Sequence, residues 1–175
     1  ERVRSKWQQR FRHVMVDEFQ DTSHVQLELV LLLVNELRNV CVVGDDDQSI
    51  YGFRGAQVGN ILDFDKHFPG TRVVKLEDNY RSKHAILAVA NAAIAQGSER
   101  RLGKVLRAAR GPGDLVRLCV TKDAVAESKM VAGELADLAK EGRPYSDMAV
   151  LYRSNLQARL IEEELRARDI RSEER

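Results

Sequence analysis

Apolar residues along the chain recur in short unbroken runs that alternate with longer stretches of helical spacing. The short runs predict strands at residues 12–16, 40–43, 72–76, 115–120 and 148–152. The longer stretches predict helices at residues 25–37, 58–68, 82–94, 124–138 and 156–168, after a polar helix end at residues 1–10. Since continuous apolar runs are typical of strands buried on both faces, the alternation predicts parallel α/β layers.

Polar residues mark where two of these helices begin. Ser23 and Gln26 form a capping-box pattern before the helix at residues 25–37, and apolar side chains on nearly all sides of that helix predict deep packing. Ser82 is the predicted N-cap of the alanine-rich helix that follows it. Residues 96–113 contain glycine, arginine and proline, which is typical of an exposed connection.

Composition narrows the class of protein without deciding it. The 175 residues are 43% hydrophobic and 31% charged, as in ordinary globular proteins, and the net charge of +1 requires any nucleic-acid surface to be local. Cys41 and Cys119 lie in apolar runs and are predicted to be buried free thiols. The four histidines show no metal-ligand spacing, and no apolar run has the length of a membrane span. The chain begins with Glu1 inside a charged helical pattern, so we expect a piece of a longer protein.

Two adjacent carboxylates, Asp17 and Glu18, end the first predicted strand. Open α/β sheets bind their ligands at the carboxyl ends of such strands. Asp17 is therefore a candidate ligand for a divalent metal, and Glu18 a candidate for polarising a water. The alternative is a simple polar turn at residues 17–23 that caps the next helix.

A second polar segment, residues 44–56, follows the second predicted strand. Gln48 can both accept and donate hydrogen bonds, which suits it to sensing a phosphate or orienting a water. Tyr51, Phe53 and Arg54 combine rings that stack on bases with a guanidinium that pairs with phosphate, as in single-strand binding grooves. The alternative is that Tyr51 and Phe53 are core aromatics beneath a loop.

A third segment, residues 79–82, precedes the alanine-rich helix. Near the positive end of the helix dipole, Arg81 is a candidate to bind an anionic phosphate, and the Tyr80 ring is a candidate to stack on a purine. On these four residues alone, a surface arginine without a partner is the preferred interpretation.

Together these segments resemble the UvrD/Rep/PcrA-like superfamily-one DNA helicases. Residues 17–22 are similar to motif II, residues 44–56 to motif III, residues 79–82 to motif IV, and residues 149–155 to the motif that precedes the 2B insertion. The resemblance covers essentially the whole chain in the family's order. It implies RecA-like parallel sheets of the P-loop NTPase type, in parts of two lobes. Residues 1–78 would be the C-terminal part of the first lobe, and residues 79–175 the N-terminal part of the second, cut near the 2B insertion.

The resemblance also implies a role for each matching residue in an ATP site. Asp17 would hold Mg²⁺, and Glu18 would activate the attacking water. Gln48 would sense the γ-phosphate and couple it to DNA. Tyr80 would stack on adenine, and Arg81 would reach the γ-phosphate as an arginine finger.

Five further residues would contact DNA by the same resemblance. Tyr51, Phe53 and Arg54 would bind the single strand, and many members carry Trp where Phe53 stands. Arg153 and Asn155 would contact the backbone from the second lobe. The implied activity is ATP-dependent movement along single-stranded DNA, 3′ to 5′, with unwinding of the duplex, in the cytoplasm and on the nucleoid of a bacterium.

A phosphate-cradling loop is missing from the printed sequence. The segment from Gly97 to Lys104 has five residues between its glycines instead of four, and Val105 stands where Ser or Thr should bind magnesium. We therefore expect a fragment that is inactive alone and whose partners are DNA and the remaining helicase domains. Two alternatives stay open, a non-catalytic DNA- or protein-binding remnant and the helicase part of a recombination nuclease.

Overall fold

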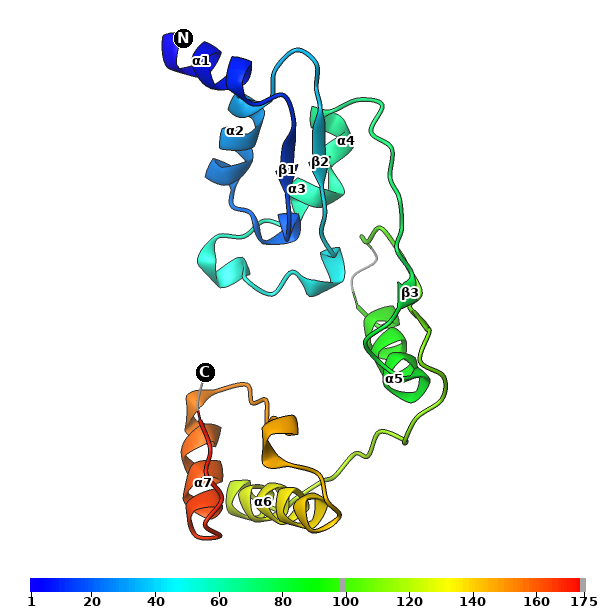
Figure 1. The fold of residues 1–175 in the computed structure, drawn as a ribbon, viewed down its shortest axis with the longest axis vertical. Helices are drawn as coiled ribbons and strands as arrows, with labels where there is room; N and C mark the ends of the chain where they lie inside the picture. Colours follow the sequence, from blue (N-terminus) through cyan, green and yellow to red (C-terminus); the bar gives the residue numbers. More distant parts are fainter. Residues whose placement is uncertain (98–99, 174–175) are drawn as a thin grey trace. The chain divides into compact units, whose positions relative to one another are not determined.

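The computed structural model describes residues 1–97 and 100–173, which divide into two compact units (Figure 1). The first unit is Glu1–Val116, and the second is Arg117–Arg175. Each combines helices with short extended segments. No helix in the described part of the chain is long and apolar enough to cross a membrane.

A two-stranded parallel sheet lies at the centre of the first half of unit 1. Strands β1 (Val14–Val16) and β2 (Val40–Val42) lie side by side (Figure 1) in a register that pairs Val14 with Val40. Helix α1 (Arg2–Arg10) precedes β1, and α2 (His24–Leu33) connects the strands. The parallel arrangement follows from this crossover, because a parallel pair needs a long connection.

Three single-turn 3₁₀ helices and two short α-helices complete this half of the unit. They are η1 (Phe19–Asp21), η2 (Asp46–Gln48), η3 (Gly52–Arg54), α3 (Gly59–Leu62) and α4 (Phe64–His67). The core joins η1, α2, α3 and α4 through Phe19, Leu27, Val30, Val34, Ile61, Phe64 and Phe68. Both strands place their valines against this core.

The rest of unit 1 contains a second parallel pair and one long helix. Strand β3 (Asp78–Asn79) pairs with β4 (Arg107–Ala108), and α5 (His84–Ala95) lies between them in the sequence. Asn91 anchors α5 to this pair, since its side chain exchanges two hydrogen bonds with the backbone of Leu106.

Unit 2 is a pair of helices with one 3₁₀ turn. Helix α6 (Ala124–Lys140) packs against α7 (Asn155–Arg166), and η4 (Tyr145–Asp147) lies between them in the chain. Its core consists of Ala132, Ile161, Leu165 and Ile170. Asp123 caps α6 by accepting a hydrogen bond from the Ala126 N–H at 2.7 Å.

The prediction that the strands are buried on both faces is wrong. The valines of β1 and β2 contact the core, but Met15 and Cys41 on the opposite face are exposed. Cys119 is also exposed, so the prediction of buried thiols is wrong for both cysteines. Side chains alternate across a strand, and no described element packs over the second face.

The predicted strands at residues 72–76, 115–120 and 148–152 do not form. Their apolar side chains are largely exposed, for example Val74, Leu118 and Leu151. A strand requires a neighbouring strand to pair its backbone N–H and C=O groups, and these segments find none in the described chain. Apolar composition is therefore insufficient to form a strand here.

The largest differences from the predicted helices concern α2, the segment of α3 and α4, and α5. Helix α2 ends at Leu33 instead of residue 37. Its residues Val25 and Leu29 are exposed rather than deeply packed. The predicted helix at residues 58–68 is split at Asp63 into α3 and α4. The N-cap of helix α5 is Lys83, so the prediction of Ser82 as its cap is wrong.

Candidate functional site

The two predicted acids lie directly after β1. The Asp17 carboxylate accepts a hydrogen bond from the Glu18 N–H at 3.0 Å, and both residues are exposed. Glu18 has a left-handed backbone (φ 49°, ψ 42°), a conformation that costs an L-residue about 1–2 kcal/mol. Ser23 alone caps α2, through a complete capping box with Gln26. The acids are thus not needed as helix caps, and a strained backbone at such a position is typical of a functional site.

Gln20 holds this acidic turn against the end of β2, a role that the sequence analysis missed. Its side chain is 1% exposed. Its Nε2 donates to Glu18 Oε2 at 2.7 Å, and its Oε1 accepts from the Asp45 N–H at 3.0 Å. The Phe19 N–H also donates to the Val43 carbonyl at 3.0 Å. The ends of β1 and β2 are therefore joined by hydrogen bonds, as expected for neighbouring parallel strands.

The oxygen donors of this turn fit a hard divalent cation such as Mg²⁺. Asp17 and Glu18 supply exposed carboxylate oxygens, which are the ligands that Mg²⁺ prefers. Oδ1 of Asp21 is buried and has no hydrogen-bond partner in the described chain. A buried carboxylate oxygen without a partner is costly unless water or a cation satisfies it. The chemistry of the turn thus suits a hydrated metal ion.

A cluster of three aspartates follows β2 and is held by cations from a distant segment. Arg101 makes a two-point ion pair with Asp47, Nε to Oδ1 at 2.6 Å and Nη2 to Oδ2 at 3.0 Å. Lys104 pairs with Asp45 and with Asp47, the latter at 3.0 Å. The Leu102 N–H donates to Asp46. These contacts cover the acidic loop; residues 98–99 of the segment from Gly97 to Lys104 lie outside the described chain.

These ion pairs shift the pKa values of the groups that form them. Burial raises the pKa of the Asp47 carboxyl, but hydrogen bonds and charge attraction from Arg101 and Lys104 outweigh it and leave the pKa below its ordinary value. Burial likewise lowers the pKa of Lys104, and its hydrogen bonds to Asp45 and Asp47 leave it raised. Both shifts favour the charged forms of Asp47 and Lys104.

Gln48 lies on the exposed side of this acidic loop. Its Nε2 donates to Asp45 Oδ2 at 2.8 Å, while the Asp45 N–H donates to Gln20. Hydrogen bonds therefore link four residues in order, Gln48 to Asp45 to Gln20 to Glu18, and the path passes through both the carboxylate and the backbone N–H of Asp45. The predicted phosphate sensor and the predicted water activator are connected in this way.

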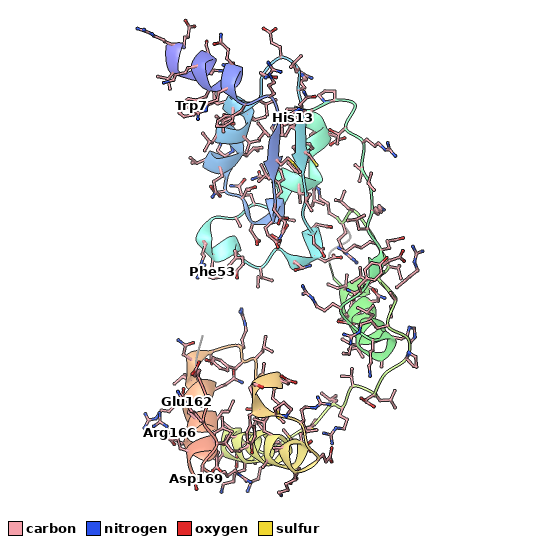
Figure 2. The ribbon with its side chains drawn as sticks, viewed as in Figure 1. Trp7, His13, Phe53, Glu162, Arg166 and Asp169 are labelled. Atoms are coloured by element: carbon pink, nitrogen blue, oxygen red, sulfur yellow. The ribbon has the colours of Figure 1, made fainter. Side chains whose placement is uncertain are left out.

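The predicted aromatic contacts form one exposed turn at η3. Tyr51 is partly exposed, and Phe53 is 79% exposed and projects from η3 (Figure 2). The ring centroids lie 6.0 Å apart, and the Arg54 guanidinium lies over both rings at 5.2 and 5.4 Å. The alternative of core aromatics is wrong, because these side chains pack on one another and on Arg54 rather than in the core.

Tyr80 and Arg81 lie in an exposed turn before α5. The side chain of Asn79 accepts from the N–H groups of Arg81 and Ser82 at 3.0 and 2.7 Å and so shapes the turn. Tyr80 is 75% exposed, and Arg110 donates to the Arg81 carbonyl. No hydrogen bond or ion pair in the described chain joins Arg81 to Glu18, so the structure does not bring these two predicted partners into contact.

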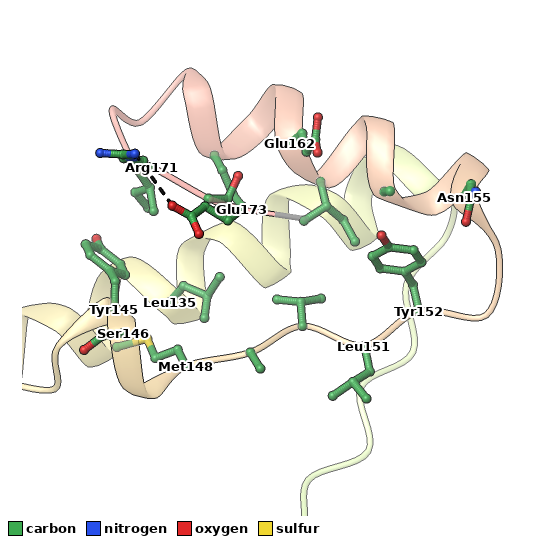
Figure 3. Close-up of a pocket in the computed structure, with 17 residues that line it drawn as sticks. Leu135, Tyr145, Ser146, Met148, Leu151, Tyr152, Asn155, Glu162, Arg171 and Glu173 are labelled. Carbon is green, nitrogen blue, oxygen red and sulfur yellow. Dashed lines mark ion pairs between the residues drawn. The ribbon is translucent and has the colours of Figure 1, made fainter. Parts of the chain in front are cut away.

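Arg153 and Asn155 lie at the start of α7 in unit 2. The Gln157 side chain accepts from the N–H groups of Arg153 and Ser154 at 3.0 and 3.2 Å. Arg153 and Asn155, the two predicted DNA contacts, are both exposed. Asn155 and Tyr152 line a groove beside α7, together with Leu151 on the segment before it (Figure 3). Arg153 and Asn155 are thus available to a ligand.

The fold and the site define an α/β protein with acidic and amide groups at the ends of two parallel strands. Comparison with known families matches residues 1–69 to the UvrD/REP helicase N-terminal domain and residues 74–173 to the UvrD-like helicase C-terminal domain. The chain therefore belongs to the UvrD-like helicase family, as its motifs predicted.

Curated relatives share close to half of the aligned residues. The chain is 44% identical to the ATP-dependent DNA helicase PcrA of Staphylococcus epidermidis over 157 residues, which are 90% of this chain and 21% of that protein. It is 46% identical to DNA helicase II of Haemophilus influenzae over 163 residues, 93% of this chain and 22% of that protein. The chain thus spans about a fifth of the length of these relatives.

Proposed function

We propose that the chain is the central part of an ATP-dependent DNA helicase that moves along single-stranded DNA, 3′ to 5′, and unwinds the duplex. The carrying observation is the hydrogen-bonded junction of the two strand ends, in which Gln20 links Glu18 to the loop that bears Gln48. Family membership and the names of the relatives support the same activity. The longer protein that contains this chain is called the parent helicase below, and it acts in the bacterial cytoplasm, on nucleoid DNA.

The acidic turn is the hydrolytic half of the proposed ATP site. Asp17 holds Mg²⁺, which when bound neutralises developing phosphate charge. Glu18 orients the attacking water and accepts its proton, and Gln48 hydrogen-bonds the γ-phosphate. Tyr80 stacks on adenine, and Arg81 supplies positive charge to the γ-phosphate as an arginine finger.

The proposed DNA contacts come from two places in the chain. Tyr51 and Phe53 stack on bases, and Arg54 pairs with phosphate. Arg153 and Asn155 bind the backbone from unit 2. We infer a RecA-like fold for both parts, with residues 1–78 in the first lobe and residues 79–175 in the second, on the basis of the change of matching family domain between residues 69 and 74.

The decisive test is Glu18→Gln in the parent helicase. The substitution keeps the size of the side chain but removes the proton acceptor, so DNA-stimulated ATP hydrolysis should fall by about 10²–10⁴-fold while DNA binding is retained. Glu28→Gln, at an exposed position on α2, is the matched control and should leave the rate unchanged. The isolated chain, which contains no Gly-Lys-Ser/Thr loop, should not turn over ATP.

Two results would contradict the proposal. One is a parent helicase whose ATPase rate is insensitive to Glu18→Gln. The other is a DNA-stimulated ATPase in the isolated chain that Glu18→Gln abolishes, which would show that no further phosphate-binding loop is required.

The exposed turn at η3 favours one second candidate, a DNA-binding module without catalysis. This module would bind single strands through Tyr51, Phe53 and Arg54, with affinity that falls as salt rises. Its binding would be the same with and without nucleotide, whereas a helicase changes its DNA affinity with the state of its nucleotide. Oligonucleotide titrations of the parent protein with and without ATP analogues distinguish the two.

A further inference from the structure

The side-chain amide of Gln20 stands at the junction between the two strand ends, and its orientation is fixed by its surroundings. One end faces a carboxylate oxygen of Glu18 at 2.7 Å, and the other faces the Asp45 N–H at 3.0 Å. Since a carboxylate accepts and an N–H donates, only Nε2 can face Glu18 and only Oε1 can face Asp45. The side chain is 1% exposed, so water cannot replace either partner.

The space around Gln20 is closed on the side of β2. A Cβ atom at Gly44 would lie 2.5 Å from Gln20 Oε1 and 2.8 Å from Ile61 Cδ1. Position 44 therefore requires glycine if Gln20 is to keep this place. The left-handed backbone of Glu18 further limits where its carboxylate can go, and the bond from Gln20 selects one position.

The geometry points to Gln20 as a positioning residue for Glu18, coupled through Asp45 to Gln48. This inference rests on the proposed function, in which Glu18 activates water and Gln48 contacts the γ-phosphate. A movement of the loop after β2 displaces the Asp45 N–H, and the displacement reaches Glu18 through one rigid amide. Gln20 thus aligns the proton acceptor only when the loop that carries Gln48 is in its working position.

The charged groups around Gln20 give the inference a specific signature. The carboxylates of Glu18 and Asp21 both face Nε2, the latter at 3.4 Å. Replacing the amide with a carboxyl in Gln20→Glu puts a third acid into this cluster. Because a carboxylate cannot donate a hydrogen bond to the Glu18 carboxylate as Nε2 does, this variant keeps the size of the side chain but loses the bond that positions Glu18, and kcat should fall.

The test uses the parent helicase with Gln20→Met, which keeps volume but removes both hydrogen bonds. Misplacement of a catalytic group by about 1 Å costs on the order of 10²-fold in rate, so kcat should fall by that factor with little change in KM for ATP. Hydrogen exchange of the Asp45 amide should become faster, because its acceptor is lost.

Asn60→Leu is the matched control, since Asn60 is also a buried amide. Its Nδ2 donates to the carbonyl and hydroxyl oxygens of Thr22, each at 3.0 Å, and makes no described contact with Glu18. This variant should lose stability without faster exchange at Asp45. If Gln20→Met does not fold, the nearly isosteric Gln20→Glu supplies the kcat and KM measurements.

The outcomes separate the inference from the proposed function. A parent protein without DNA-stimulated ATPase would overturn both. An active parent in which the Gln20 variants lose no more kcat than Asn60→Leu, with unchanged hydrogen exchange at the Asp45 amide in Gln20→Met, would overturn the role of Gln20 alone.

Discussion

Asp47 illustrates how a single side chain depends on residues far along the chain. It is joined to Arg101 by two hydrogen bonds and to Lys104 by an ion pair, and these three side chains are mostly buried. Each charge compensates the desolvation of the others. The pKa of the Asp47 carboxyl is lowered as a result, and this shift connects the ion pairs to stability.

We predict that Asp47→Asn lowers the midpoint of thermal unfolding at neutral pH by a few degrees, which corresponds to about 1 kcal/mol after solvent screening. A carboxyl whose folded pKa is depressed stabilises the fold above its unfolded pKa of about 4, and this contribution is lost as the pH falls through the folded pKa. The difference between variant and wild type should therefore fade below about pH 4.

Calorimetry of the 175-residue chain across pH measures this effect. Asp65→Asn removes the same charge from an exposed position on α4 that forms no described ion pair, and it should leave the midpoint unchanged. An equal loss in both variants would show that net charge, rather than the Asp47 network, sets the stability.

At the scale of elements, α2 begins at a cap that the local sequence specifies. Ser23 Oγ accepts from the Gln26 N–H at 3.3 Å, and Gln26 Oε1 accepts from the Ser23 N–H at 2.8 Å. We predict that Ser23→Ala destabilises the chain by about 1 kcal/mol, because an N–H at the helix start loses its acceptor. Urea unfolding provides the measurement, and Ser23→Asp, which retains a side-chain acceptor, should keep most of the stability.

Because Ser23 caps α2, the carboxylates of the acidic turn are not required as helix caps. If Ser23→Ala proved neutral, Asp17 or Asp21 would have to supply the cap instead, and their assignment to a metal and nucleotide site would weaken. The matched loss in Gln26→Ala, which removes the reciprocal bond, would identify the capping box as the source of the effect.

At the scale of the whole molecule, apolar segments without strand partners dominate the behaviour expected in solution. Leu118 and Val120 are 91% and 90% exposed in a run of β-type sequence. Exposed edges of this kind pair with other chains. We predict that the isolated 175-residue chain self-associates as its concentration rises, measured by sedimentation velocity.

Leu118→Lys together with Val120→Lys should shift the chain toward monomer. The control is Val3→Lys together with Leu156→Lys, which adds the same two charges at exposed positions on α1 and α7. It should reduce self-association less. A wild-type chain that stays monomeric at all concentrations would show that these segments are covered in solution.

The sequence by itself determined the features that depend on near neighbours. Spacing over a few residues predicts β1, β2, the helix between them, the capping box at Ser23 and the acids after β1, and the structure contains each of these, whereas three other predicted strands do not form. The family motifs were equally readable, because they are contiguous and ordered.

Tertiary structure decided whatever required a partner distant in sequence. Gln20 resembles any polar residue in the turn until the chain folds and places Asp45 against it, 25 residues away. The cations that pair with Asp47 are Arg101 and Lys104, which lie 54 and 57 positions further along the chain. For the same reason the apolar runs at 72–76, 115–120 and 148–152 form no strand in the part of the chain that the structure describes: hydrogen bonding and burial between strands are supplied by neighbours in space, which local sequence does not encode.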